Sequence, residues 1–99
     1  MGHARYEELG DLQDVLRAVR NLPGVTEPRP GIFYLRRAPF LHFHTAAGRR
    51  WADAKVGATW GAEIEVPFGA TGWMKVAVLR EIRRRHRRTA TAVGGAKGG

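Results

Sequence analysis

The chain has 99 residues, 43% hydrophobic content, no cysteine and a formal net charge of +8. This length suits one domain with a single core, and it excludes a multidomain arrangement. Without cysteine the chain has no disulfide, thiolate metal site or cysteine nucleophile. Its apolar runs are only a few residues long, far short of the ~20 that cross a bilayer, and no hydrophobic signal segment follows Met1. We therefore expect a soluble cytoplasmic protein without a membrane partner.

Near the start of the chain, apolar residues recur at spacings of three and four. The members of this stripe are Leu9, Leu12, Leu16 and Val19. The spacing predicts an amphipathic helix that starts near Asp11, packs on a sheet and ends before Pro23. Residues 1–8 lack a comparable pattern, so we expect them to be frayed unless the helix starts as early as Arg5.

After a connector, three further segments have strand patterns. Residues 25–31 contain two prolines and a glycine and predict the connector. Residues 32–36 are β-branched and aromatic and predict the first strand. The next strand and its return lie in residues 39–56, and residues 63–66 alternate as the last strand, which Pro67 ends.

The segment 39–56 predicts a β-hairpin that carries two histidines and an aspartate. Alternate side chains of a strand point to opposite faces. His42 and His44 therefore share one face, while Leu41 and Phe43 point to the core. The returning strand alternates likewise, with its alanines on the core side.

The turn of this hairpin decides which residues lie opposite each other. A two-residue turn that begins at Gly48 places His44 opposite Asp53 and His42 opposite Lys55. A slip of one residue would set apolar residues against charged ones. We therefore predict a ligand-binding site on one sheet face, made of His42, His44, Asp53 and Lys55.

The strand at residues 32–36 is expected to pair with the histidine strand through a turn at Arg37. In that register Ile32 and Tyr34 face the core. Phe33, Leu35 and Phe40 then share the histidine face, which would be partly apolar.

A basic helix is predicted at the end of the chain. Thr71 is a good N-cap, and apolar spacing continues to about Arg88. Residues 67–99 contain eight basic residues and one acid, a net charge of +7. The arginines that fall opposite the apolar stripe are Arg80, Arg84, Arg87 and Arg88. Residues 89–99 are rich in Ala, Gly and Thr and predict a disordered tail, which leaves residues 1–88 as the folded domain.

Together these elements predict an α+β domain in the order α-β-β-β-β-α. Its sheet is an antiparallel four-stranded meander, flanked by an N-terminal and a C-terminal helix.

Several short motifs resemble one known family in type and order. They are Leu22-Pro23-Gly24-Val25-Thr26, then Phe33-x-Leu35, then His42-x-His44 and finally Ala52-Asp53. This order resembles the small "luciferase domain" family of bacterial and fungal proteins, which is mostly uncharacterised and unrelated to the flavin-dependent luciferases. The run that starts at Leu22 also resembles the MmcQ/YjbR-like family, whose small α+β domains are suspected of binding DNA. The resemblance implies a small α+β domain and leaves its ligand and cofactor unassigned.

The histidine face suits three kinds of site. The first is a binding site for a small or acidic ligand, which we take as the working function. Imidazole and carboxylate are also zinc ligands, but a hydrogen bond between His44 and Asp53 explains the same pattern, so we assign no metal. A hydrolase-like enzyme could use these two residues as a general base, with water or substrate as nucleophile because the hairpin has no serine.

The basic helix offers a function of a different class. Arg80, Arg84, Arg87 and Arg88 could contact phosphates of a nucleic acid, and such binding would depend strongly on salt. An ordinary solvated helix face explains the same arginines, and basic residues in a last turn also suit the helix dipole.

Overall fold

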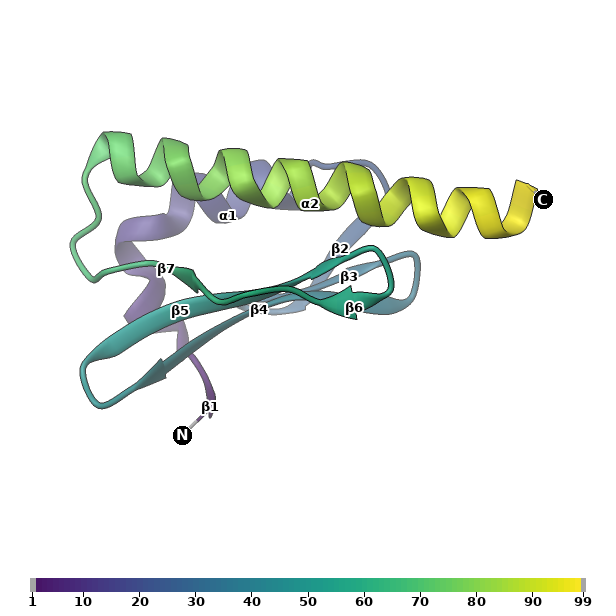
Figure 1. Ribbon diagram of the computed structural model, residues 1–99. Helices are drawn as coiled ribbons and strands as arrows, with labels where there is room; N and C mark the ends of the chain where they lie inside the picture. Colours follow the sequence, from purple (N-terminus) through teal and green to yellow (C-terminus); the bar gives the residue numbers. More distant parts are fainter. Residues whose placement is uncertain (1, 99) are drawn as a thin grey trace.

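The computed structural model describes residues 2–98, with side chains described for residues 2–92. A 3₁₀ segment (Tyr6–Leu12) leads into α1 (Gln13–Arg20), and α2 (Gly72–Gly98) ends the described chain. The strands are β1 (Gly2–His3), β2 (Val25–Arg29), β3 (Ile32–Leu35), β4 (Ala38–Ala46), β5 (Arg49–Val56), β6 (Thr59–Trp60) and β7 (Ile64–Glu65). Both helices lie on the same side of the sheet, and no helix among residues 2–98 covers its other side (Figure 1).

The predicted fold class is confirmed. Strands β2 to β5 follow α1 and precede α2 in the chain, and they form an antiparallel four-stranded meander. Strand β6 continues the sheet beside β5. The connector predicted at residues 25–31 is wrong, because Val25 pairs with Leu35 and Thr26 with Tyr34. Pro28 has no backbone N–H to donate to a neighbouring strand. It is tolerated here because it lies where the register shifts, between the paired residues Thr26 and Arg29.

The faces of β3 are the reverse of the prediction. Phe33 and Leu35 are buried in the core, whereas Ile32 lies opposite His42. The turn centres on Arg36 and Arg37, both with positive φ, as a type I′ turn requires. This turn starts one residue earlier than predicted, which alone would shift the pairing by two residues and keep the faces. A β-bulge at Phe33 and Tyr34 makes the net shift odd, and this moves the side chains of β3 to the opposite face.

The face of the sheet toward the helices carries the core. The prediction that Phe40 lies on the histidine face is wrong, because a β-bulge between β3 and β4 lets both Phe40 and Leu41 be fully buried in the core. Phe43 packs edge-on against Phe33 with ring centroids 6.5 Å apart. The helices add their own buried residues, among them Leu12, Leu16, Val19, Val78 and Ile82.

The final helix continues beyond its predicted end at Arg88. Thr89 is buried, its hydroxyl donates a hydrogen bond to the carbonyl of Lys55 at 3.2 Å, and it accepts one from the N–H of Gly57 at 3.0 Å. The prediction that the tail starts at Thr89 is therefore wrong. Gly99, the last residue of the predicted tail, lies outside the described residues, as does Met1 at the other end.

A buried arginine joins three parts of the chain. The Arg50 side chain donates two hydrogen bonds to the carboxylate of Asp11, at 2.7 and 2.8 Å. It also donates to the carbonyls of Glu8, Val66 and Pro67. The hydrogen bonds from Arg50 to the Asp11 carboxylate lower the pKa of Asp11 to about 2, although burial opposes the shift. Arg50 thus ties the 3₁₀ segment and the segment after β7 to β5.

Within the described part of the chain, no helix combines the length and apolar composition needed to cross a membrane.

Candidate functional site

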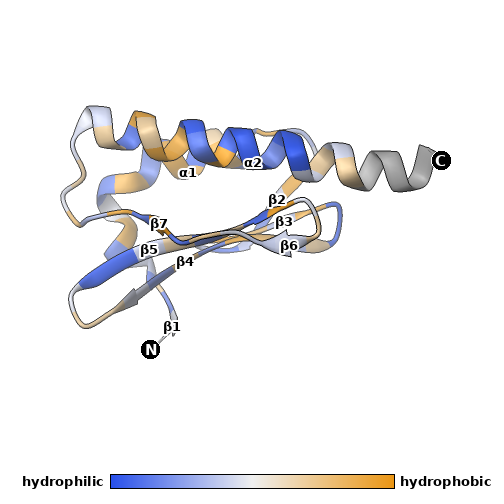
Figure 2. Ribbon diagram, viewed as in Figure 1, coloured by the Kyte–Doolittle hydropathy of each residue, from blue (hydrophilic) through white to orange (hydrophobic). Residues whose placement is uncertain are grey.

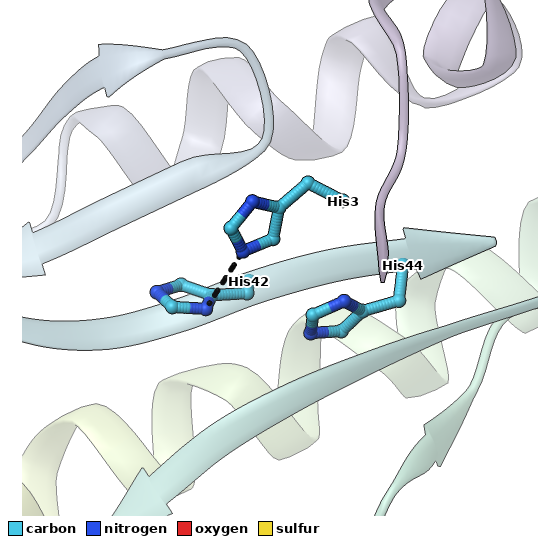
Figure 3. Close-up of side chains that lie close together, drawn as sticks. All are labelled: His3, His42 and His44. Carbon is cyan, nitrogen blue, oxygen red and sulfur yellow. Dashed lines mark hydrogen bonds between the residues drawn. The ribbon is translucent and has the colours of Figure 1, made fainter. Parts of the chain in front are cut away.

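Three histidines from two distant parts of the sequence meet on the sheet face opposite α1 and α2. Beyond the end of β3, β1 pairs with β4 and sets His3 directly opposite His44. His42 is two residues before His44 and therefore points the same way. Nε2 of His3 lies 3.3 Å from Nδ1 of His42, and one nitrogen from each ring lies within 4.8 Å of the others (Figure 3).

The N-terminal segment is held in place by specific contacts. Ala4 is buried, and its N–H donates to the carbonyl of Phe43 at 2.9 Å. The Glu8 carboxylate accepts hydrogen bonds from the N–H of Arg5 and the hydroxyl of Thr45. The prediction that residues 1–8 are frayed is therefore wrong for the described part of that segment. Sequence reasoning missed His3 because a two-residue strand is too short to show a periodic pattern.

The predicted site residues share a face, but their register differs from the prediction. His42, not His44, lies opposite Asp53, and His44 lies opposite Trp51. The turn centres on Ala47 and Gly48, both with positive φ, instead of beginning at Gly48. The resulting shift of two residues changes the partners and keeps the faces, since side chains alternate with a period of two.

The predicted contact between His44 and Asp53 is still made, along a diagonal. Nε2 of His44 lies 3.1 Å from Oδ2 of Asp53. Diagonal neighbours on adjacent strands are within reach of long side chains. The carboxylate therefore holds the orientation of this ring.

A row of five rings crosses the face. From one end to the other, the members are Trp60, His42, His3, His44 and Trp51, with centroids of successive rings 4.9 to 5.5 Å apart. A cation lies over each end: Lys55 Nζ is 5.3 Å from the Trp60 ring, and the Arg49 guanidinium is 4.5 Å from the Trp51 ring. Lys55, a predicted site residue, thus lies at the edge of the row, against Trp60.

The surroundings of His42 lower the pKa of its imidazole. Partial burial lowers its pKa below the usual 6.5, and the neighbouring His3, His44 and Lys55 add to this effect while Asp53 opposes it. The lowered pKa favours the uncharged ring, in which one nitrogen carries the proton and the other can accept a hydrogen bond or bind a cation.

A shallow cavity of about 300 Å³ opens beside His42. Its lining consists of His3, Pro28, Arg29, Ile32, Tyr34 and His42. The Arg29 side chain is exposed at its rim, and the nearby acid Glu27 is already paired with Arg20 at 2.6 Å. The cavity therefore combines an apolar wall with a guanidinium and two imidazoles.

The predicted arginines of α2 all lie on its exposed side, and hydrophilic turns fill the middle of this helix (Figure 2). Arg84 is not free, because it donates two hydrogen bonds to Glu81, at 3.0 and 2.8 Å. Arg83 is a further exposed arginine that sequence reasoning left out. Arg85 is buried and donates to the carbonyl of Ala54, so it belongs to the fold.

Comparison with protein-family models, curated proteins and solved structures gave no match. The resemblance to the luciferase-domain and MmcQ/YjbR-like families therefore stays a prediction.

Proposed function

We propose that this chain is a small binding domain whose histidine face holds a small anionic ligand. The observation that carries the proposal is the cavity between His42 and Arg29. Ligand sites are typically concave and mostly apolar, with a few polar groups that fix the ligand. Ile32 and Tyr34 supply the apolar wall here.

The charges near this cavity favour an anion. Arg29 keeps its charge at every accessible pH and presents donors that match carboxylate or phosphate oxygens. His3 and His42 add N–H donors on the other side of the cavity. The acid nearest the imidazoles, Asp53, is occupied by His44 at 3.1 Å.

Sulfate and adenosine monophosphate are suitable probes, and the fluorescence of Trp60, whose ring lies 5.2 Å from that of His42, reports their binding. Arg29→Gln should weaken binding roughly 10-fold or more, because it removes a charge-assisted hydrogen bond. Arg17→Gln is the matched control, since Arg17 is exposed on α1, away from the cavity. Equal affinity in both variants would refute the proposal.

The pH dependence of sulfate binding has an expected sign. Sulfate keeps its double negative charge near neutral pH, so the titration reports on the protein. Burial and neighbouring charges hold the pKa of His42 below 6.5. In the chain stripped of metal with a chelator, affinity should therefore rise as the pH falls from about 8 to about 5, because His42 gains a positive charge. His42→Gln should flatten this rise, and an affinity that increases with pH would contradict it.

A second candidate function is nucleic-acid binding through α2. It is favoured by a shallow cavity of about 220 Å³ lined by Arg80, Arg83, Arg87, Val76 and Leu79. Three phosphate contacts would give a slope of log affinity on log salt near −3, at about −0.9 per contact. This function would use a surface separate from the histidine face.

The double variant Arg83→Gln/Arg87→Gln should reduce that slope by about two. Arg84→Gln is the matched control, because Glu81 already neutralises Arg84 and the slope should change less. Fluorescence anisotropy of a labelled duplex at about 50 and about 200 mM salt measures the slope. Absence of binding at the lower salt concentration would exclude this function for α2.

A further inference from the structure

We propose that His3, His42 and His44 bind a divalent metal ion of the zinc class, and that this ion anchors the anion on the histidine face. The second half of this statement rests on the function proposed above. The first half rests on the geometry of the three rings alone.

The spacing of the ring nitrogens fits a tetrahedral metal. A zinc–nitrogen bond is about 2.0–2.1 Å, so two histidine nitrogens on one tetrahedral ion lie roughly 3.3–3.4 Å apart. Nε2 of His3 and Nδ1 of His42 are 3.3 Å apart. The nitrogen of His44 lies within 4.8 Å of both, so a small rotation of its ring completes the set. Both nitrogens of the closest pair already point toward each other (Figure 3).

The type of ligand selects the class of ion. Imidazole binds zinc and the other late first-row divalent metals, whereas calcium and magnesium require mostly oxygen ligands. Three histidines leave the fourth tetrahedral position open, which is the arrangement of zinc sites that bind an exchangeable ligand.

Asp53 supports this arrangement from outside the set of ligands. Histidines that bind metals commonly donate their second ring N–H to a carboxylate, which fixes the tautomer and the orientation of the ring. Nε2 of His44 lies 3.1 Å from Oδ2 of Asp53, close enough for this bond to form when Nδ1 of His44 binds the ion. Asp53 is thus a positioning residue.

The open position explains why the site also suits an anion. The cavity bounded by Arg29 adjoins two of the three histidines. An oxyanion there can place one oxygen on the ion while Arg29 binds another. The ligand class is therefore a small molecule with a carboxylate, sulfate or phosphate group.

The test uses the full chain, stripped of metal with a chelator and then titrated with Zn²⁺ by calorimetry and with Co²⁺ by absorption. We expect one ion per chain and the visible bands of four-coordinate Co²⁺. His3→Ala and His44→Ala should each weaken binding more than about 100-fold, beyond the range of outer-shell changes. His3 is exposed, so its replacement leaves the core intact.

Two further variants separate a built site from adventitious binding. Asp53→Asn should weaken Zn²⁺ binding roughly 10- to 100-fold. Glu7→Gln, an exposed change in the same N-terminal segment, should leave the affinity unchanged. Binding that survives in His44→Ala, or no binding in the unmodified chain, would overturn the metal site.

Sulfate binding measured with chelator and with Zn²⁺ distinguishes the two proposals. Tighter binding with Zn²⁺, lost in His44→Ala, supports both. Sulfate binding that depends on Arg29 but ignores Zn²⁺ overturns the anchoring role and keeps the proposed function. Zn²⁺ binding by all three histidines without sulfate binding in either condition supports the metal site and overturns the proposed function.

Discussion

Replacing Arg50 with Met should lower the free energy of unfolding by about 3–5 kcal/mol, because it removes the buried donor on which the half-buried Asp11 and three backbone carbonyls depend. Arg50 is 1% exposed and is the donor to Asp11 and to three backbone carbonyls. Methionine fills part of the space but cannot donate to these carbonyls, and it leaves the Asp11 carboxylate with the N–H of Ala70 in place of the guanidinium. A domain of this size is stable by only about 5–15 kcal/mol in all, so much of its stability would be lost.

The adjacent residue provides a matched control. Arg49 undergoes the same substitution on the exposed side of β5, where it pairs with Glu63 and Glu65. Such surface pairs contribute about 0–1 kcal/mol. Urea denaturation followed by circular dichroism measures both variants. Equal losses would contradict the role assigned to Arg50.

Phe43→Ala should cost about 3–5 kcal/mol of stability, the usual range for emptying a buried aromatic position. Phe43 is 1% exposed and packs against Phe33. It also lies between His42 and His44 on β4, so its loss loosens the strand that carries two of the three clustered histidines.

Phe68→Ala removes the same number of atoms from a residue that is 46% exposed. Its ring covers the guanidinium of Arg50, at 4.6 Å. We expect a loss of about 1 kcal/mol, within the range of an exposed cation–π contact. Thermal and urea denaturation of both variants check this difference, and a nearly unchanged stability of Phe43→Ala would contradict its place in the core.

Local periodicity was enough to predict the helices and the histidine face. Alternation along β4 and β5 places His42, His44 and Asp53 on one side, and this holds although the register is two residues from the predicted one. A period of two makes the face insensitive to even shifts. The same argument failed for β3, where the shift was odd.

Only the tertiary structure decided the two turns. Arginine and alanine rarely adopt positive φ, yet Arg36, Arg37 and Ala47 all do so. The twist of the paired strands favours a type I′ turn at each place, and the burial of Phe33 and Leu35 selects the register. Turn residues chosen by such long-range packing give no local signal.

The sequence by itself determined the class of the fold, the core side of the hairpin and two of the three clustered histidines, because these follow from the spacing of neighbouring residues. Only the tertiary structure brought His3 beside His44 and buried Arg50 against Asp11. Both contacts join residues about forty positions apart, and a pairing over that distance is set by the packing of the whole domain. For this reason the third histidine, which completes the proposed metal site, lay beyond the reach of sequence periodicity.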